Sequence, residues 1–276
     1  MLKLEVNSMS AFLLIGTDSE HFVERDGIIS SAHGQIGGSK DKPLLVDKGN
    51  LQEDNILAEF AIDPVHTEQA WVESIHSVLS TLRERMKDKG YELVCKSSYA
   101  INKDKLLSFG GAMEMGCQPD YNVYSGRDNN KPTPFVELRT AAGHVHFSYE
   151  NPSLPTTCSI VKCLDYCLGL ASLLYDEDRS RRTMYGRAGD IRLKFYGGEY
   201  RTLGNYWLRD DKLMKQIYKY TRICVEHHEQ LLPMFNALLP ERDVVDAINS
   251  YNVDLATAFS PEIDKIMEKF YDQLPA

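Results

Sequence analysis

The sequence predicts an α+β fold, in which a mainly antiparallel sheet is covered by helices. Strand-like segments dominate the first half of the chain, one long helical pattern interrupts them, and three helical patterns finish the chain. A regular alternation of strands and helices, which would indicate a parallel sheet, is absent. With 276 residues, 43% of them hydrophobic, the chain can bury a core as one large domain or two small ones.

The strands are predicted from apolar runs and from alternation of polar and apolar residues. Residues 11–23 change from a solid apolar run to alternation, and residues 51–61 form a second extended segment. A glycine-rich turn, GQIGGSKDKP, lies between these two segments. The other strand-like segments are residues 91–101, 135–149, 189–196 and 199–203.

The helices are predicted from apolar residues that recur with a period near 3.6. Across residues 66–88 the recurring residues include Trp71, Ile75 and Val78, and Gly90 follows as a stop signal. A second helix is expected over residues 157–175. From residue 210 onward three helical patterns follow, with Pro240 and Pro261 expected to mark starts.

Composition excludes several classes of protein. The chain has 31 Lys and Arg against 40 Asp and Glu, a formal net charge of −9, which disfavours binding to nucleic acid. We expect no membrane span, because no segment approaches the roughly 18 uninterrupted apolar residues that one needs. Residues 11–15 are too short for a signal peptide, and the six cysteines fit buried reduced thiols, so we expect a cytoplasmic protein.

Polar residues at every second position of the predicted strands are the informative feature. Asp18 and Glu20 would project from one face of an extended segment, as would Glu53, Asn55 and Glu59. The same spacing relates His144 to His146 and Glu199 to Arg201. Each pair alone fits an ordinary solvent-facing strand, half-buried histidines or a surface ion pair. Their combination predicts one sheet face lined with carboxylates and imidazoles.

A basic cluster accompanies these pairs. Arg187, Arg192, Lys194 and Arg201 fall within fifteen residues of an otherwise acidic chain. Hard carboxylate oxygens suit Mg²⁺, and guanidinium groups suit phosphoryl oxygens. The combination therefore favours a polyphosphate held through a divalent metal such as Mg²⁺. No GxSxG elbow and no Walker lysine motif is present in the sequence.

The order of these motifs resembles the glutamine synthetase and glutamate-cysteine ligase superfamily, and within it the carboxylate-amine (COOH-NH2) ligase family of tailed bacteriophages. The resemblance spans about residues 12–208 and leaves the C-terminal helices uncovered. The segments that carry it are IGGSKDKP, DNILAEF, GCQPDYNVYSG, RTAAGHVHF, LDYCLGLASLLYDEDRSRRTMYG and RAGDIRLKFYGGEYRTLGNYW.

The resemblance implies one catalytic domain over residues 1–276, with residues 209–276 as a helical segment packed on it. It implies a curved antiparallel sheet that forms an open, funnel-like active site with helices behind it, as in glutamine synthetase. ATP would convert a carboxylate to an acyl phosphate, which an amine then converts to an amide. The acid and amine would be small molecules or peptides, and their identity and the oligomeric state stay open.

The resemblance also implies roles for individual residues. Asp18, in place of the Glu of better-known relatives, and Glu20 would face different metal ions. The other metal ligands would be Glu59, with Glu53 as a less certain companion, His144 and Glu199. Arg187 and Arg192 would neutralise the transferred phosphoryl group beside Arg201, and His146, Lys194 and Lys40 would face the nucleotide.

Two residues and two functions stay open at this point. Arg139 would either face the substrate carboxylate or pair with Glu137, and Asp165 would be either a structural anchor or a site residue. A metal-dependent hydrolase could also use two acids, HxH and a further Glu. A phage structural or interaction protein that kept the fold without activity is the third class.

Overall fold

The computed structural model describes residues 13–112, 120–129 and 137–271. The predicted α+β class is confirmed, because helices pack against a sheet whose strand pairs are all antiparallel among these residues. The order along the main path of this 11-stranded sheet is β3-β4-β5-β1-β11-β13-β12-β8-β9, and β2 and β6 also pair with β1. Strands β7 and β10 form a separate pair.

The strands differ greatly in length, and the longest is central to the sheet. Strand β1 spans Ile15–Arg25 and lies between β5 (Leu57–Ile62) and β11 (Gly143–Ser148). The remaining strands are β2 (Ile28–Ser30), β3 (Leu44–Val46), β4 (Gly49–Asp54), β6 (Glu92–Val94), β7 (Ser98–Ala100), β8 (Tyr121–Asn122), β9 (Arg127–Asp128), β10 (Leu138–Thr140), β12 (Asp190–Lys194) and β13 (Gly197–Tyr200).

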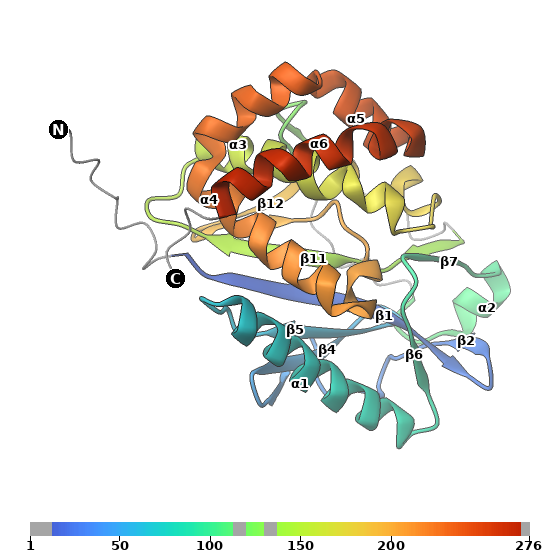
Figure 1. Ribbon diagram of the computed structural model, residues 1–276. Helices are drawn as coiled ribbons and strands as arrows, with labels where there is room; N and C mark the ends of the chain where they lie inside the picture. Colours follow the sequence, from blue (N-terminus) through green and yellow to red (C-terminus); the bar gives the residue numbers. More distant parts are fainter. Residues whose placement is uncertain (1–12, 113–119, 130–136, 272–276) are drawn as a thin grey trace.

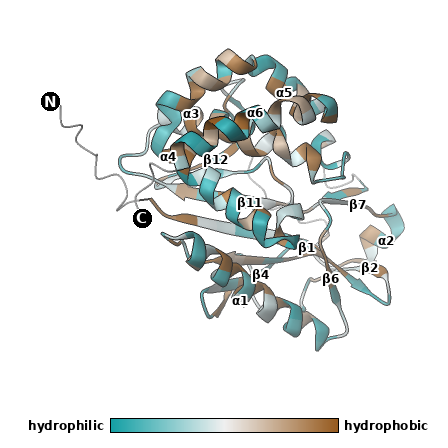
Figure 2. Ribbon diagram, viewed as in Figure 1, coloured by the Kyte–Doolittle hydropathy of each residue, from teal (hydrophilic) through white to brown (hydrophobic). Residues whose placement is uncertain are grey.

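The helices are α1 (Glu68–Lys87), α2 (Lys103–Ser108), α3 (Leu154–Leu164), α4 (Asp211–Leu238), α5 (Glu241–Ser250) and α6 (Val253–Tyr271). Thr67 caps α1 by accepting from the amide of Ala70 at 3.2 Å, and the predicted helix is confirmed. Figure 1 shows α1 beside β4 and β5, with α3, α4, α5 and α6 grouped over the β11–β12 part of the sheet. Hydrophilic and hydrophobic residues mix along α1 and α6 (Figure 2), as expected for helices with one buried side.

The face of the sheet toward the helices is apolar. Phe60, Val145, Phe147, Ile191 and Tyr200 are all fully buried in one core. Aromatic packing joins α1 to the 3₁₀ turn Asn205–Arg209, since the rings of Trp71 and Trp207 stack with centroids 5.7 Å apart. The indole of Trp207 also donates to the carbonyl oxygen of Gly143 at 3.3 Å, next to His144.

Four element predictions are wrong. Residues 91–101 divide into β6 and β7, and residues 135–149 divide into β10 and β11. Residues 51–61 do not form one strand: β4 and β5 are a hairpin that turns at Asn55, whose φ is 59°. Asp54 and Asn55 are favoured turn residues, and their preference outweighs the apparent alternation. Pro261 does not start a helix but lies inside α6, whereas Pro240 does precede α5.

The segment Leu154–Leu174 is long and apolar enough to cross a membrane by length and composition. However, 78% of an 18-residue apolar window in this segment is buried inside the fold, as in the core helix of a globular protein. It consists of α3, a π-helical turn (Asp165–Gly169) and a 3₁₀ turn (Ala171–Leu174).

Asp165 begins the π-helical turn and anchors β13 from the core side. Its Oδ1 atom accepts from the hydroxyl of Tyr200 at 2.6 Å. Gly169 leaves space for this contact, because a Cβ there would lie 2.8 Å from the Tyr200 hydroxyl. Asp165 is therefore a structural anchor of the strand that carries Glu199.

Replacing Asp165 by Asn tests this anchor. Burial raises the pKa of Asp165 to about 7, compared with about 3.9 for an exposed aspartate. Between these values the folded protein retains a proton that the unfolded chain has released, so wild-type stability falls as the pH rises. We expect the wild type to lose about 2–4 kcal/mol relative to Asp165→Asn between pH 4 and 7, measured by urea unfolding. A stability difference that does not change with pH would contradict this account.

Candidate active site

The strand register brings the predicted site residues to one face of the sheet. Asp18 lies opposite His144 in the pairing of β1 with β11, and Glu20 lies opposite Glu59 in the pairing of β1 with β5. On the next strand, Glu199 lies between His146 and Arg192. Directly paired residues on antiparallel strands point to the same side, so these side chains share the face opposite the apolar core.

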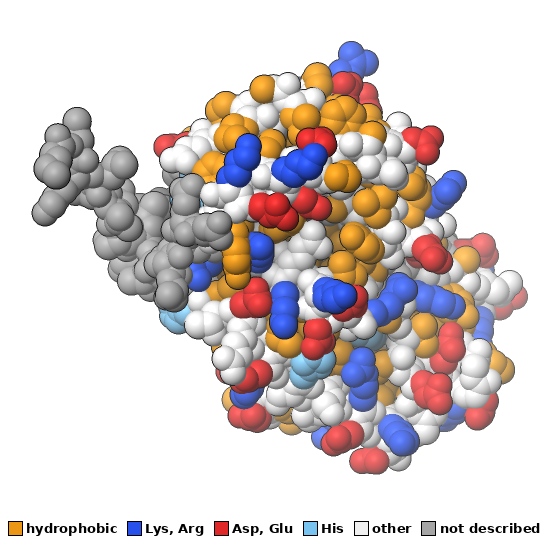
Figure 3. Space-filling view, in the orientation of Figure 1, with side chains coloured by type: hydrophobic (Ala, Val, Ile, Leu, Met, Phe, Trp, Pro, Cys, Tyr) orange, Lys and Arg blue, Asp and Glu red, His pale blue; other side chains and the backbone are white. Residues whose placement is uncertain are grey.

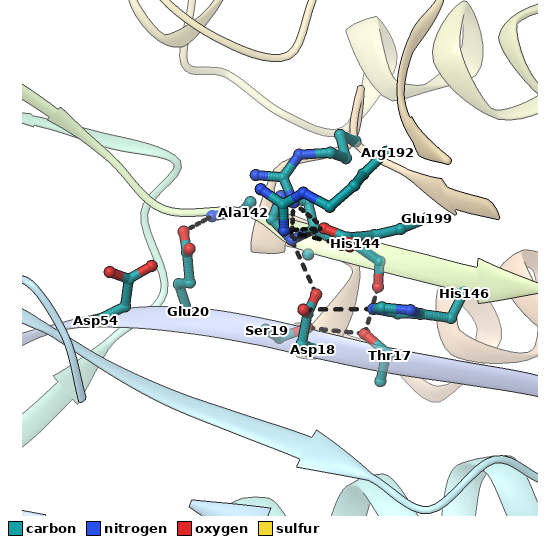
Figure 4. Close-up of polar contacts among 12 residues, drawn as sticks. Thr17, Asp18, Ser19, Glu20, Asp54, Ala142, His144, His146, Arg192 and Glu199 are labelled. Atoms are coloured by element: carbon teal, nitrogen blue, oxygen red, sulfur yellow. Dashed lines mark hydrogen bonds and ion pairs between the residues drawn. The ribbon is translucent and has the colours of Figure 1, made fainter. Parts of the chain in front are cut away.

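The first cluster consists of Asp18, His144 and Glu199. Their ligand atoms lie within 4.8 Å of one another. The Nδ1 atom of His144 is 2.8 Å from Oδ1 of Asp18, and its Nε2 atom is buried without a hydrogen-bond partner among the described residues. Figure 4 shows this group gathered between β1 and β11.

The second cluster consists of Glu20, Asp54 and Glu59, with ligand atoms again within 4.8 Å. Glu20 accepts a hydrogen bond from the amide of Ala142 at 2.8 Å. In Figure 4, Glu20 and Asp54 lie apart from the Asp18 group, so adjacent acids on β1 serve different clusters.

Burial makes these carboxylates costly to ionise without a nearby cation. It raises the pKa of Glu20 to about 8, with a further contribution from Asp54. It also raises the pKa of Glu59 well above its usual value, and Asp18 and Glu20 add to the effect. The second cluster is therefore under-compensated by cations.

The buried carboxylate charges of the first cluster are better compensated by neighbouring groups than those of the second cluster. Burial acts to raise the pKa of Asp18, but His146 and His144 together lower it well below its usual range. Burial, followed by the Arg201 charge, lowers the pKa of His144 to about 3, so this imidazole is neutral at pH 7. Because an ionised carboxylate can only accept, Nδ1 of His144 donates to Asp18.

Three cationic side chains converge on Glu199. Its carboxylate lies 3.2 Å from Nη1 of Arg192, 2.9 Å from Nζ of Lys194, and in direct contact with Nη1 of Arg201. Burial and Asp18 nevertheless leave the pKa of Glu199 raised. His146 extends the same group, with Nε2 3.3 Å from Asp18 and Nδ1 2.7 Å from the Tyr196 hydroxyl.

Other predicted residues lie elsewhere. Arg187 is exposed and donates to the carbonyl oxygens of Arg182 and Thr183, so the structure does not bring it to the clusters. Lys40 contacts Asp54 of the second cluster at 2.7 Å. Their predicted roles stay predictions.

Glu53 and Arg139 also lie outside the two clusters. Glu53 accepts from the amide of Gly34, on the glycine-rich turn. Arg139 is buried and donates to the carbonyl oxygens of Leu138 and Ala112. The predicted segment GCQPDYNVYSG is described only from Asp120 onward, and residues 113–119 lie outside the described residues.

The sequence interpretation missed Asp54 and Asp120. Asp54 escaped because the β4–β5 hairpin was taken as one strand, although an Asp-Asn pair is a turn signal that would have revealed it. Asp120 is buried and lies 2.8 Å from Nε of Arg201 and 3.9 Å from Nη2 of Arg192. No local pattern marked it, because its arginine partners lie more than seventy residues away in the sequence.

Both clusters have the donor chemistry of a divalent-cation site. Carboxylate oxygens suit hard ions such as Mg²⁺, and one imidazole is compatible with Mn²⁺ as well. Two observations are consistent with cation-binding groups. The pKa values of Glu20 and Glu59 are raised, and the Nε2 atom of His144 has no hydrogen-bond partner among the described residues. The residues present therefore fit the metal ions that the resemblance implies.

A comparison with family models identifies one match. Residues 132–267, just under half of the chain, match the model described as phage phiEco32-like COOH.NH2 ligase-type 2. The predicted family resemblance is confirmed. The COOH.NH2 ligase match includes the C-terminal helices almost to their end, whereas the sequence resemblance stopped near residue 208. It contains His144, Glu199 and the basic cluster, and it does not include β1 or β5.

Solved structures give distant matches. An apo GmaS structure without ligand is 12% identical with a TM-score of 0.41, and covers 96% of this chain and 70% of that one. A bifunctional glutathione synthetase from Pasteurella multocida is 12% identical with a TM-score of 0.46, and covers 96% of this chain and 47% of that one. The chain thus spans about half the length of that synthetase. No curated protein matches.

The two clusters predict two separable metal sites. We expect the wild type to bind two Mn²⁺ ions in a calorimetric titration, because each cluster supplies three ligands. Asp18→Asn and Glu20→Gln should each remove one ion and leave the other. Glu92→Gln, which neutralises an exposed carboxylate on β6, is the matched control. Simultaneous loss of both ions in either variant would show that the clusters are not independent.

Proposed function

We propose that this protein is an ATP-dependent ligase that joins a carboxylate to an amine through an acyl-phosphate intermediate. The observation that carries the proposal is the convergence of two carboxylate clusters and three cationic side chains on one sheet face. The match of residues 132–267 to a COOH.NH2 ligase family supports it. We further propose the glutamine synthetase-like arrangement, in which this face lines an open funnel.

The chemistry requires activation of the acid. A carboxylate does not react with an amine at neutral pH, because oxide is a poor leaving group. In the proposed reaction a carboxylate oxygen of the acid attacks the γ-phosphorus of ATP, and ADP leaves. The amine nitrogen then attacks the acyl carbon, inorganic phosphate leaves, and the nitrogen releases a proton. Every step is a displacement that needs no covalent nucleophile from the protein.

The chain's own groups would position reactants and offset negative charge. Asp18, His144 and Glu199 would hold one Mg²⁺ ion, and Glu20, Asp54 and Glu59 a second. These ions would supply charge neutralisation for the phosphoryl oxygens. Arg192, Lys194 and Arg201 are arranged around Glu199, so we propose that the triphosphate lies over the first cluster.

The second cluster would then lie toward the acid and amine. It is the less compensated of the two, with only Lys40 in direct ionic contact among the described residues. We propose that the acid and the amine are small molecules or peptides.

The direct test incubates the protein with ATP, Mg²⁺ and pools of acids and amines. We expect ADP release that depends on both pools, and a hydroxamate when hydroxylamine replaces the amine. Glu199→Gln should abolish both products. Hydrolysis of an amide without ATP, together with zinc in the purified protein, would instead support a metal-dependent hydrolase.

A variant of Arg192 tests whether this residue acts in the phosphoryl-transfer step or only in ATP binding. Its guanidinium touches Glu199 and is partly exposed to the site, so its proposed partner is the charge that develops on the transferred phosphoryl group. We expect Arg192→Ala to lower kcat roughly 100-fold and to change the Kd of ATP by less than about 3-fold. Arg242→Ala, an exposed arginine on α5, is the control. Equal losses of ATP affinity and of kcat would show that Arg192 serves only to bind ATP.

A further inference from the structure

Tyr185 lies at the point where the basic cluster meets the first carboxylate cluster. Its ring forms an edge contact with the ring of His144, with centroids 6.2 Å apart. The guanidinium carbon of Arg201 lies 5.0 Å from the ring centroid, and that of Arg181 lies 5.4 Å from it. One aromatic ring therefore contacts a candidate metal ligand and two arginines.

The segment that carries Tyr185 is held rigidly against the site. Arg181, which is 1% exposed, donates to the carbonyl oxygens of Thr202 at 2.6 Å and Arg201 at 3.0 Å. The amide of Tyr185 donates back to the carbonyl oxygen of Arg181 at 2.8 Å. Gly186 follows with φ of 73°, and a Cβ there would meet the Arg181 guanidinium. The chain from Arg181 to Gly186 thus fixes the ring relative to the strand end at Arg201.

The ring face, and not the hydroxyl, makes the contacts. The Tyr185 hydroxyl is buried and has no hydrogen-bond partner among the described residues. Its aromatic face, in contrast, offers a cation–π surface to Arg201.

As a partner of Arg201, the ring differs from Glu199 in one important respect. Arg201 contacts Glu199 directly and lies 2.8 Å from Asp120 through Nε. If Glu199 holds a metal ion, its negative charge is shared with that ion, and its hold on Arg201 weakens. The attraction of a neutral ring does not change when the ion binds. Tyr185, like Asp120, lies outside both clusters and is therefore a partner that holds Arg201 whether or not the ion is bound.

We propose that Tyr185 is a positioning residue, whose ring orients the Arg201 guanidinium toward the reacting groups. The proposal rests on the proposed function, because Arg201 is there assigned to the triphosphate. It adds a tyrosine to the site that neither the sequence motifs nor the metal clusters assign.

The activity test compares two substitutions of the same residue. Tyr185→Phe keeps the ring and should retain kcat within about 2-fold, whereas Tyr185→Leu should lower kcat roughly 10-fold. The Kd of Mg²⁺ alone should change less than about 3-fold in both variants. Tyr185→Met, which has a long and flexible side chain without a π face, should behave as Leu does and serves if the Leu variant does not fold. The proposal would be overturned if Tyr185→Phe lowered kcat as much as Tyr185→Leu does, because the hydroxyl and not the ring would then be the group required.

A second readout does not depend on ligase activity. The Nε–Hε resonance of Arg201, assigned by its loss in Arg201→Lys, should show a ring-current displacement in the metal-free protein. This displacement should persist in Tyr185→Phe and disappear in Tyr185→Leu. Tyr271→Leu is the matched control, because Tyr271 on α6 carries a cation–π contact with Lys219 in the helical layer. An unchanged Arg201 resonance in Tyr185→Leu would overturn the positioning role, whatever the outcome for the ligase reaction.

Discussion

The cost of burying several carboxylates on one face of a sheet is the constraint on which this structure depends. Glu59 and Glu199 are 5% and 0% exposed, and buried charges are stable only when cations or hydrogen bonds compensate them. The first cluster has Arg192, Lys194, Arg201 and two histidines for this purpose. The second cluster has one lysine contact and raised carboxyl pKa values. The carboxyl groups of the second cluster therefore resist ionisation unless a further cation compensates them.

The two faces of the sheet differ in their side chains: one carries the apolar core and the other carries the candidate site residues. One face packs Phe60, Val145 and Tyr200 against the helices, and this apolar core holds the strands in a fixed register. Because side chains alternate, the same register places Glu59, His144 and Glu199 on the other face. Asp165 and Trp207 reinforce it from the core side through Tyr200 and Gly143. The helical surface in Figure 3 shows acidic and basic side chains interspersed, with no extended basic patch on that face.

Local pattern predicts much of this arrangement, because a period of two identifies which residues of one strand share a face. It cannot predict which strands become neighbours, since pairing β1 with both β5 and β11 is set by long-range packing. Asp18 and Glu20 were therefore recognisable as a pair from their spacing, whereas their division between two metal ions was implied by the family resemblance and not by the local pattern. Asp54 was missed because one turn was not recognised, and Asp120 because its partners lie far away in the sequence.

The account depends most directly on two ions bound over adjacent strands. Anomalous diffraction from crystals soaked in Mn²⁺ measures this without reference to any substrate. Two peaks are predicted, one among Asp18, His144 and Glu199 and the other among Glu20, Asp54 and Glu59. The account would be contradicted by Mn²⁺ peaks that lie only outside both clusters, or by the absence of any peak at a saturating Mn²⁺ concentration.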